Sequence, residues 1–285
     1  MSETASLQPS KAAQPKRARS ILKRGWIRRV VWRSLIVVLY LFLLAPVLVV
    51  LVMSFDTQSF MAFPPQGFTL DWYARLTENA AFIKGFQVSA VVAISATALA
   101  TAIGVPAALA LTRHRFRGRG GVSSLFLAPL MVPTVVLGLA LLLTLSPWGL
   151  TGSYPGLILA HLAITTPYIV RTTAMSLMTA DLACEEAARI LGANAWTTFR
   201  RVTVPLALPG ILGGAVIAFI ISFDEAVISL FVVGSSATTL PVEIYKYVQF
   251  RSDPQIAALS VVLILISLIF VVLIERIIGL GRALR

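Results

Sequence analysis

The chain has 285 residues, of which 58% are hydrophobic and 13% are charged, with a mean hydropathy of +0.87. Because soluble domains carry about 25% charged residues, this composition excludes an ordinary water-soluble domain and favours a protein whose solvent is a bilayer. The formal net charge is +12, and the single cysteine, Cys184, excludes an internal disulfide framework. In a soluble protein such a charge would suggest nucleic-acid binding. Whether it does so here depends on where the lysine and arginine residues lie relative to the apolar runs.

Six apolar runs follow one another, each close to the roughly 20 residues that a helix needs to cross about 30 Å of hydrocarbon. All six are predicted to be helices, because a single spanning segment must satisfy its own backbone hydrogen bonds. The alternation typical of a membrane β-barrel is absent. The prediction is therefore an all-α integral membrane protein with six transmembrane helices. The runs are Ser34–Met53, Phe86–Leu111, Val122–Leu145, Pro155–Leu177, Leu206–Val233 and Gln255–Ile274.

Lysine and arginine predict the orientation of these spans. Nineteen of the 24 basic residues lie before the first run or after the second, fourth or sixth run, whereas four lie on the opposite side. By the positive-inside rule, both termini and the segment between the fourth and fifth runs are cytoplasmic. This placement accounts for the charge without nucleic acid, which is not expected as a partner, and favours contact with anionic membrane lipid.

The first 33 residues form a basic cytoplasmic tail. The start of this tail is rich in Ala, Ser, Gln and Pro, which favours disorder. The apolar run that follows it is too long for a signal peptide, and no A-x-A-like cleavage site follows. We therefore expect residues 34–53 to be an uncleaved first transmembrane helix.

Small residues recur at every fourth position in two of the runs, a pattern typical of helices that pack closely in membranes. Both helices are therefore expected to be buried against others. The residues are Ala96, Ala100, Gly104 and Ala108 in the second run, and Gly210, Gly214 and Ala218 in the fifth.

Two polar connections, residues 55–85 and 234–254, lie on the side opposite the termini. The first contains Trp72 and Tyr73, which suit a membrane interface. Both connections are candidates for contact with an extracytoplasmic partner, and simple surface connection is the alternative.

No enzyme motif is present. His114 and His161 are isolated, and the sequence contains no H-E-x-x-H, G-x-S-x-G or cysteine pair. It also lacks the G-x-x-x-x-G-K-[ST] loop that cradles nucleotide phosphates. We therefore expect no catalytic residue, no metal site and no cofactor on this chain. Energy for uphill transport would have to come from another chain or from an ion gradient.

A polar segment, EEAARILGANAWTTFRRVTVP, interrupts the apolar sequence between the fourth and fifth runs. The residues predict two short helices joined by a turn, either lying on the membrane surface or docking onto a cytoplasmic partner. In the first helix, Asp181 is expected to be the cap, Glu185 and Glu186 to lie in the early turns, and Gly192 to end the helix. Asn194 is expected to cap the second helix, which has Trp196 and Phe199 on one face. Pro205 is expected to begin the fifth span.

This segment resembles the E-A-A-x3-G-x9-I-x-L-P signature of the permease subunits of binding-protein-dependent, type I ABC importers. Glu186, Ala187 and Ala188 are followed after three residues by Gly192, and after nine more by Val202-Thr203-Val204-Pro205. Val202 replaces Ile and Val204 replaces Leu, and both changes are conservative. The resemblance covers roughly residues 60–275, and the basic tail lies outside it.

The resemblance implies the type I importer permease fold in a bacterial inner membrane. The segment would be a coupling helix in a groove of an ATP-hydrolysing subunit, with Glu186 paired to a basic residue there and Gly192 as the turn. The implied partners are an ABC ATPase homodimer that holds ATP and Mg²⁺, a second and different permease chain, and a periplasmic binding protein. The residues assigned to coupling are Glu185, Glu186, Ala187, Ala188, Gly192 and Pro205.

On this interpretation the chain divides into a tail, a first helix, a periplasmic segment and a core permease domain with five helices. The ranges are 1–33, 34–53, 54–85 and 86–275, with the coupling segment at 181–205 and a cytoplasmic C-terminus at 276–285.

Ionisable residues inside the fifth run are the second candidate site. Asp224 and Glu225 adjoin Ser222 and Phe223, and burying a charge in a bilayer costs about 2.5–3.5 kcal/mol on insertion scales. On one continuous helix, Ser222, Glu225 and Ser229 would share a face. We expect a polar wall toward a translocation pathway or a partner subunit; a buried hydrogen-bonding role is the alternative. Tyr168 is a further candidate for aromatic contact with a cation.

The stretch from Ser222 through the L-P at Leu240-Pro241 to the last run resembles the second permease of spermidine/putrescine importers. Acidic residues in a pathway would suit a cationic amine. The alternatives are the same machinery for an opine, an amino-acid-like compound or an aminophosphonate, an ion-coupled secondary transporter, or a structural scaffold. No convincing internal repeat supports a secondary transporter, and the acids argue against a scaffold.

Overall fold

The structure is a computed structural model that describes residues 17–234 and 236–278. Helices and the loops between them account for all of these residues. The chain divides into two compact units, Met1–Val52 and Met53–Arg285, and each is described by itself.

The described part of the first unit is helix α1, Arg17–Met53, whose last residue is the first of the second unit. Its segment Arg29–Met53 is long and apolar enough to cross a membrane, which agrees with the first predicted run. The helix also includes residues 17–33, which were predicted to belong to the basic tail and not to the first span. The apolar residues Val30 and Val31 extend the apolar sequence of the span into that region. Residues 1–16 of the tail lie outside the described residues.

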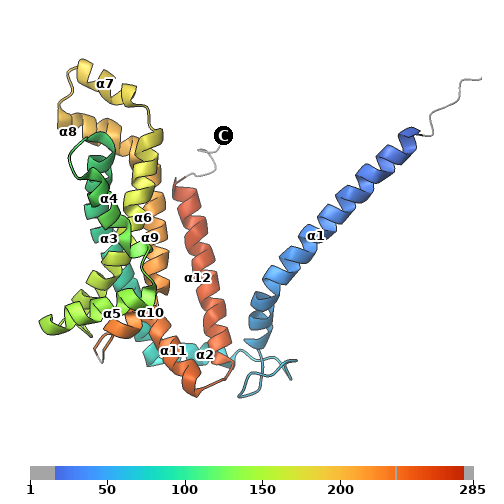
Figure 1. Cartoon of the computed structure of the whole chain (residues 1–285). Helices are drawn as coiled ribbons and strands as arrows, with labels where there is room; N and C mark the ends of the chain where they lie inside the picture. Colours follow the sequence, from blue (N-terminus) through green and yellow to red (C-terminus); the bar gives the residue numbers. More distant parts are fainter. Residues whose placement is uncertain (1–16, 235, 279–285) are drawn as a thin grey trace, which may run out of the picture. The chain divides into compact units, whose positions relative to one another are not determined.

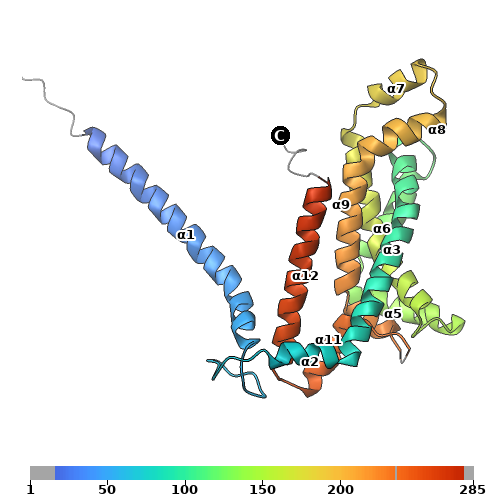
Figure 2. The same cartoon turned by 180° about the vertical axis from the view of Figure 1, so that it is seen from behind.

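Three long helices form the centre of the second unit: α3 (Ala80–Arg113), α6 (Tyr154–Thr179) and α9 (Val204–Asp224). They pack against one another along their lengths and stand side by side in both opposite views (Figures 1 and 2). The two expected stripes of small residues lie in these contacts. All four small residues of α3 are buried, as are Gly214 and Ala218 of α9.

Gly104 and Gly214 show why these positions are small. A Cβ on Gly104 would lie 2.8 Å from Cγ2 of Ile169, and one on Gly214 would collide with the hydroxyl of Thr172. Close approach of α6 to both α3 and α9 therefore depends on the absence of a side chain.

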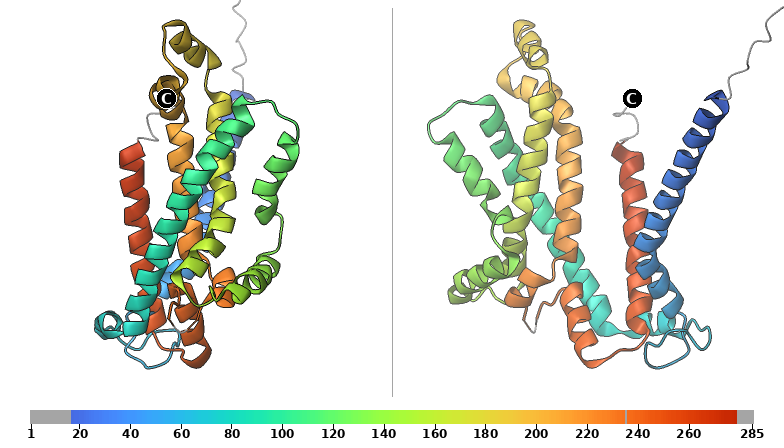
Figure 3. Two further views of the ribbon diagram at one scale, coloured as in Figure 1. Left: turned by 90° about the vertical axis from the view of Figure 1, so that its left-hand side faces the viewer. Right: turned by 45° about the vertical axis from the view of Figure 1, so that its right-hand side comes forward.

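The third predicted span is not one straight helix. Helices α4 (Arg119–Leu127) and η1 (Ala128–Leu130) are followed by α5 (Thr134–Leu145) and η2 (Ser146–Trp148), and the two halves are bent by 104° (Figure 3). Pro133 explains the break: its ring disfavours a helical conformation at Val132, and it has no N–H to donate.

The fifth predicted span, Leu206–Val233, is also broken. Helix α9 ends at Asp224, Glu225 is extended with φ −71° and ψ 109°, and α10 then runs from Val227 to Val232. The expectation of one continuous helix with Ser222, Glu225 and Ser229 on one face was therefore wrong. In the described part of the chain, three helices are long and apolar enough to cross a membrane, and the bent α4–α5 pair makes a fourth if counted as one span.

Helices α2 (Asp71–Glu78), α11 (Leu240–Phe250) and the start of α12 (Gln255–Ile278) lie at the end of the bundle opposite α7 (Figure 1). The backbone N–H of Met61 donates to the carbonyl of Ser252 at 2.8 Å, joining the two polar connections. Trp72 was expected at a membrane interface but is buried, and its Nε1 donates to the carbonyl of Asp56 at 2.6 Å. Its apolar ring gains more from this packing than from an exposed position.

Tyr247 of α11 helps to hold the loop into α12. Its hydroxyl lies 2.6 Å from Oδ2 of Asp253 and 2.8 Å from Oε1 of Gln255. Burial, reinforced by the hydrogen bond to Asp253, raises the pKa of Tyr247 to about 12. The phenol is therefore neutral, and able to donate, throughout the physiological range.

Candidate functional site

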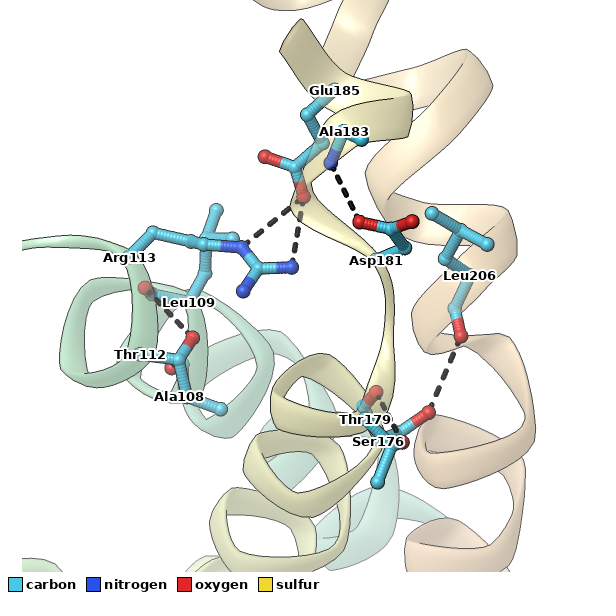
Figure 4. Close-up of polar contacts among 10 residues, drawn as sticks. All are labelled: Ala108, Leu109, Thr112, Arg113, Ser176, Thr179, Asp181, Ala183, Glu185 and Leu206. Carbon is cyan, nitrogen blue, oxygen red and sulfur yellow. Dashed lines mark hydrogen bonds and ion pairs between the residues drawn. The ribbon is translucent and has the colours of Figure 1, made fainter.

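The polar segment between α6 and α9 begins with a capped helix, α7 (Leu182–Ile190). The carboxylate of Asp181 accepts from the N–H of Ala183 at 2.9 Å, which confirms its predicted capping role (Figure 4). Gly192 ends the helix with φ +88°, a left-handed conformation that favours glycine, which confirms the prediction for this position.

A second short helix, α8 (Ala195–Thr198), follows, and Oδ1 of Asn194 caps it by accepting from Thr197 N at 2.8 Å. Contrary to prediction, α8 is not separate from the fifth span. It continues through a π-helical turn, η3 (Phe199–Thr203), into α9, and the helical path runs from Ala195 to Asp224. Pro205 lies in the first turn of α9, as predicted. The wider turn, in which Val204 N donates to Phe199 O, accommodates a proline that cannot continue the ordinary bonding pattern.

The two acids of α7 have different surroundings. Glu186 is exposed, whereas the side chain of Glu185 is only 7% exposed. Oε1 of Glu185 accepts from Nε of Arg113, at the end of α3, at 3.1 Å and lies 3.0 Å from Nη2 of the same guanidinium (Figure 4). Glu186 is therefore free to face a partner, while Glu185 is occupied within the chain.

Helices α7 and α8, residues 182–198, form the α7–α8 tip, which exposes large apolar side chains. Ile190 and Leu191 are 85% and 86% exposed, and Trp196, which packs against Phe199 with ring centroids 5.6 Å apart, is 65% exposed. Such a cluster at the end of a polar segment is typical of a protein-contact surface.

The base of the tip is anchored to the bundle. Ser176 of α6 donates through its hydroxyl to the carbonyl of Leu206 at 3.3 Å (Figure 4). A Cβ on Gly210 would lie 2.6 Å from the carbonyl of Thr172, so the start of α9 can approach α6 only with glycine there. These two contacts hold the start of α9 against α6 at the base of the tip.

The second candidate site lies at the break between α9 and α10. Oε1 of Glu225 accepts from the N–H of Ile228 at 2.9 Å, so this acid satisfies a free donor at the start of α10. Asp224, the preceding residue, is exposed. The two neighbouring acids therefore differ in role: one stabilises the break and the other is available to solvent or a ligand.

His161 of α6 holds the break from the inside. Its Nδ1 lies 2.7 Å from Oγ of Ser222 on α9, and its Nε2 lies 3.0 Å from Oγ of Ser229 on α10. All three side chains are buried, His161 and Ser229 completely. A neutral imidazole has one donor and one acceptor nitrogen, so it can satisfy both hydroxyls at once.

Asp224 opens onto a cavity of about 310 Å³ between α3, α9 and α12. Three aromatic rings form a cluster there: Phe223 meets Phe86 edge-on at 5.6 Å and stacks on Phe219 at 5.9 Å. The cavity thus combines an apolar, aromatic wall with one carboxylate, a combination that suits an organic cation. Its lining residues are Phe86, Ala90, Phe219, Ile220, Phe223, Asp224, Leu263, Ile266 and Ser267.

Comparison with known proteins gives this arrangement a family. Residues 100–280 match the model of the family described as "Binding-protein-dependent transport system inner membrane component". The chain belongs to this family of permeases. The permease is 34% identical over 234 residues to the spermidine/putrescine transport system permease protein PotC of Escherichia coli, covering 82% of this chain and 88% of PotC. It is 31% identical over 210 residues to the molybdenum transport system permease protein ModB of Haemophilus influenzae, covering 68% and 92%.

A solved structure supports the fold. A chain of a bacterial ABC transporter involved in the import of the acidic polysaccharide alginate matches the permease with a TM-score of 0.65 and 17% identity, covering 94% of this chain and 99% of that one. At this identity the likeness shows the fold alone, which is that of ABC importer permeases.

The structure brings some of the predicted site residues of the permease together and separates others. Phe223 and Asp224 share the cavity, whereas Ser222 turns into the core toward His161. Tyr168 is half-buried on α6 and does not line this cavity. No cluster of metal-ligating side chains occurs in the part of the chain that the structure describes.

Sequence reasoning missed two residues of the permease that connect its elements, Arg113 and His161. His161 was treated as isolated, although a histidine within a span is itself a signal of a buried polar partner. Arg113 was counted only as one of several basic loop residues, and nothing in the local sequence singles it out from Arg115, Arg117 or Arg119.

Proposed function

We propose that this permease imports a small cationic amine of the spermidine/putrescine class across the bacterial inner membrane, powered by ATP hydrolysis on a separate subunit. The cavity at Asp224 supports the assignment of a cationic amine as the substrate. Its phenylalanine cluster offers faces to a cation and to a methylene chain, and its exposed carboxylate offers the opposite charge. The name of the relative PotC, a spermidine/putrescine transport system permease protein, agrees with this chemistry.

The α7–α8 tip supports the energetic half. Its exposed apolar side chains and the exposed Glu186 would dock into a groove of an ABC ATPase dimer, which would hold ATP and Mg²⁺. The tip would then lie in the cytoplasm together with both termini, in a permease with six spans of which two are broken. A second, different permease chain and a periplasmic binding protein would complete the importer.

Switching requires two arrangements whose balance a ligand shifts. Closure of the ATPase dimer would move the tip, and α6 and α9 would follow because Ser176, Gly210 and Leu206 hold them together at its base. The break at Glu225 would let α10 change its angle without unfolding α9.

The test is reconstitution of the permease pair with its ATPase in vesicles, with the binding protein added outside. We expect uptake of radiolabelled spermidine or putrescine that requires ATP and is competed by other amines. Competition by an opine, an amino-acid-like compound or an aminophosphonate, without competition by amines, would overturn the substrate assignment. Uptake on an ion gradient without the ATPase would overturn the energetic assignment.

A further inference from the structure

The acid that precedes the E-A-A motif has a partner far away in the sequence. Glu185 of α7 pairs with Arg113, the last residue of α3 and 72 residues earlier in the chain. We propose that this ion pair links α7 to α3, so that Arg113 and Glu185 act as positioning residues that pass movement of the tip into the substrate cavity. The inference rests on the proposed coupling role of the tip.

Helix α7 has few other ties to the bundle. It packs against α8 and η3, which belong to the same segment, and it joins α6 through Ala180, whose backbone is extended. Within the described residues, the Arg113 pair is the ion pair that joins α7 to a long helix of the bundle. Without it, movement of α7 would reach the bundle through the chain connections to α6 and α9 alone.

The environment of the pair favours a firm contact. The side chains of Arg113 and Glu185 are 12% and 7% exposed, so neither charge has much access to water. Surface ion pairs contribute little, but separating a largely buried pair leaves an uncompensated charge. Because separating the two charges is unfavourable, Arg113 should follow Glu185 when α7 is displaced.

Helix α3 carries this link to the other end of the molecule. It runs from Ala80 to Arg113 and packs along both α6 and α9. Near its far end, Phe86 forms part of the cavity wall and contacts Phe223, next to Asp224. One helix thus has the ion pair at one end and a cavity residue toward the other. A shift of α3 would move its wall of the cavity relative to α9.

The experiment measures solute taken up per ATP hydrolysed in the reconstituted importer. Arg113→Glu and Glu185→Arg should each lower this ratio roughly fivefold or more. A factor of about five is the lower end of the effect that one coupled site has on the affinity of another. The combined exchange Arg113→Glu/Glu185→Arg should restore most of it, because opposite charges again face each other. Arg117→Glu, the same charge change at an exposed arginine just after the end of α3, is the control and should leave the ratio unchanged.

Folding defects are separated by a second variant. Arg113→Met/Glu185→Leu removes both charges, a replacement that buried pairs often tolerate without loss of stability. The complex with this variant should assemble and melt like the wild type, but its uptake per ATP hydrolysed should be as low as in the single exchanges. A normal ratio in this variant, or single exchanges no worse than Arg117→Glu, would overturn the inference. If the wild-type complex itself showed no ATP-dependent uptake, the proposed function would fail instead.

Discussion

The α7–α8 tip and the α9–α10 break differ in which side chains they expose and which they bury. At the tip, Ile190 and Leu191 are exposed and Glu185 is withdrawn into an ion pair. At the break, Ser222, Ser229 and His161 are buried and satisfy one another. An apolar exposed surface calls for a partner, whereas a polar buried cluster must be complete within the chain. The comparison shows that exposed apolar side chains characterise a surface available for docking, and that a completed polar cluster characterises an internal support.

The largest expected effect is at the buried support. His161→Ala would leave the hydroxyls of Ser222 and Ser229 without their partner. Because each unsatisfied buried group costs about 1–3 kcal/mol, the loss of both partners should lower the free energy of unfolding by about 2–6 kcal/mol. Denaturation in detergent checks this, with His114→Ala in an exposed loop as the control. Equal stability of the two variants would show that the break does not depend on His161.

The helix that joins the two regions offers a matched pair of glycines. Gly214→Ala places a Cβ against the hydroxyl of Thr172, whereas a Cβ on Gly213 meets nothing within 4 Å. Overpacking should cost Gly214→Ala about 1–3 kcal/mol, and Gly213→Ala should be neutral or more stable by about 0.5–1 kcal/mol. Thermal melting of both variants tests whether α6 and α9 are as tightly packed as the structure indicates. Similar melting temperatures would contradict it.

At the tip, Gly192→Ala should act on docking more than on the bundle. A residue with a Cβ in a left-handed conformation costs about 1–2 kcal/mol, so affinity for the ATPase should fall roughly tenfold, since each 1.4 kcal/mol is a factor of ten. Binding of the purified ATPase to the permease in nanodiscs measures this. Gly121→Ala, in open space within α4, is the control. Wild-type affinity together with a lower melting temperature would place the role of Gly192 in folding.

An effect on uptake without an effect on assembly is expected at the exposed acid of the break. Asp224→Asn keeps the shape of the side chain but removes its charge, so the concentration of amine needed for half-maximal uptake should rise roughly tenfold, since a charged hydrogen bond contributes about 1.5–3 kcal/mol. Assembly with the ATPase should not change. Asp71→Asn, at an exposed acid of α2, is the control. Unchanged uptake kinetics in Asp224→Asn would favour a packing role for this residue.

Local chemistry explains what could be predicted from the sequence. The caps at Asp181 and Asn194 and the turn at Gly192 depend on residues within three positions, so their side chains or backbone conformations suffice to place them. The stripes of small residues on α3 and α9 follow from helical periodicity in the same way. Trp72 was misplaced because its partner, the carbonyl of Asp56, lies 16 residues away across a loop.

The breaks in the two predicted spans mark a different limit. Pro133 is a signal for the bend between α4 and α5, although the apolar run through it obscured that signal. The break at Glu225 has no proline or glycine beside it. It is held by a side chain from another helix, His161, which hydropathy along the chain cannot locate.

The sequence by itself determined that the chain is helical and membrane-embedded, that it carries the E-A-A segment, and where the first helix of that segment begins and ends. Periodicity, composition and capping depend on residues that are close together in the chain, so they can be identified from the sequence alone. Only the tertiary structure decided that Glu185 faces Arg113 while Glu186 is exposed, and that Ser222 turns away from the cavity that Asp224 enters. These choices depend on which helices lie side by side, because burial assigns neighbouring residues of similar chemistry to opposite roles.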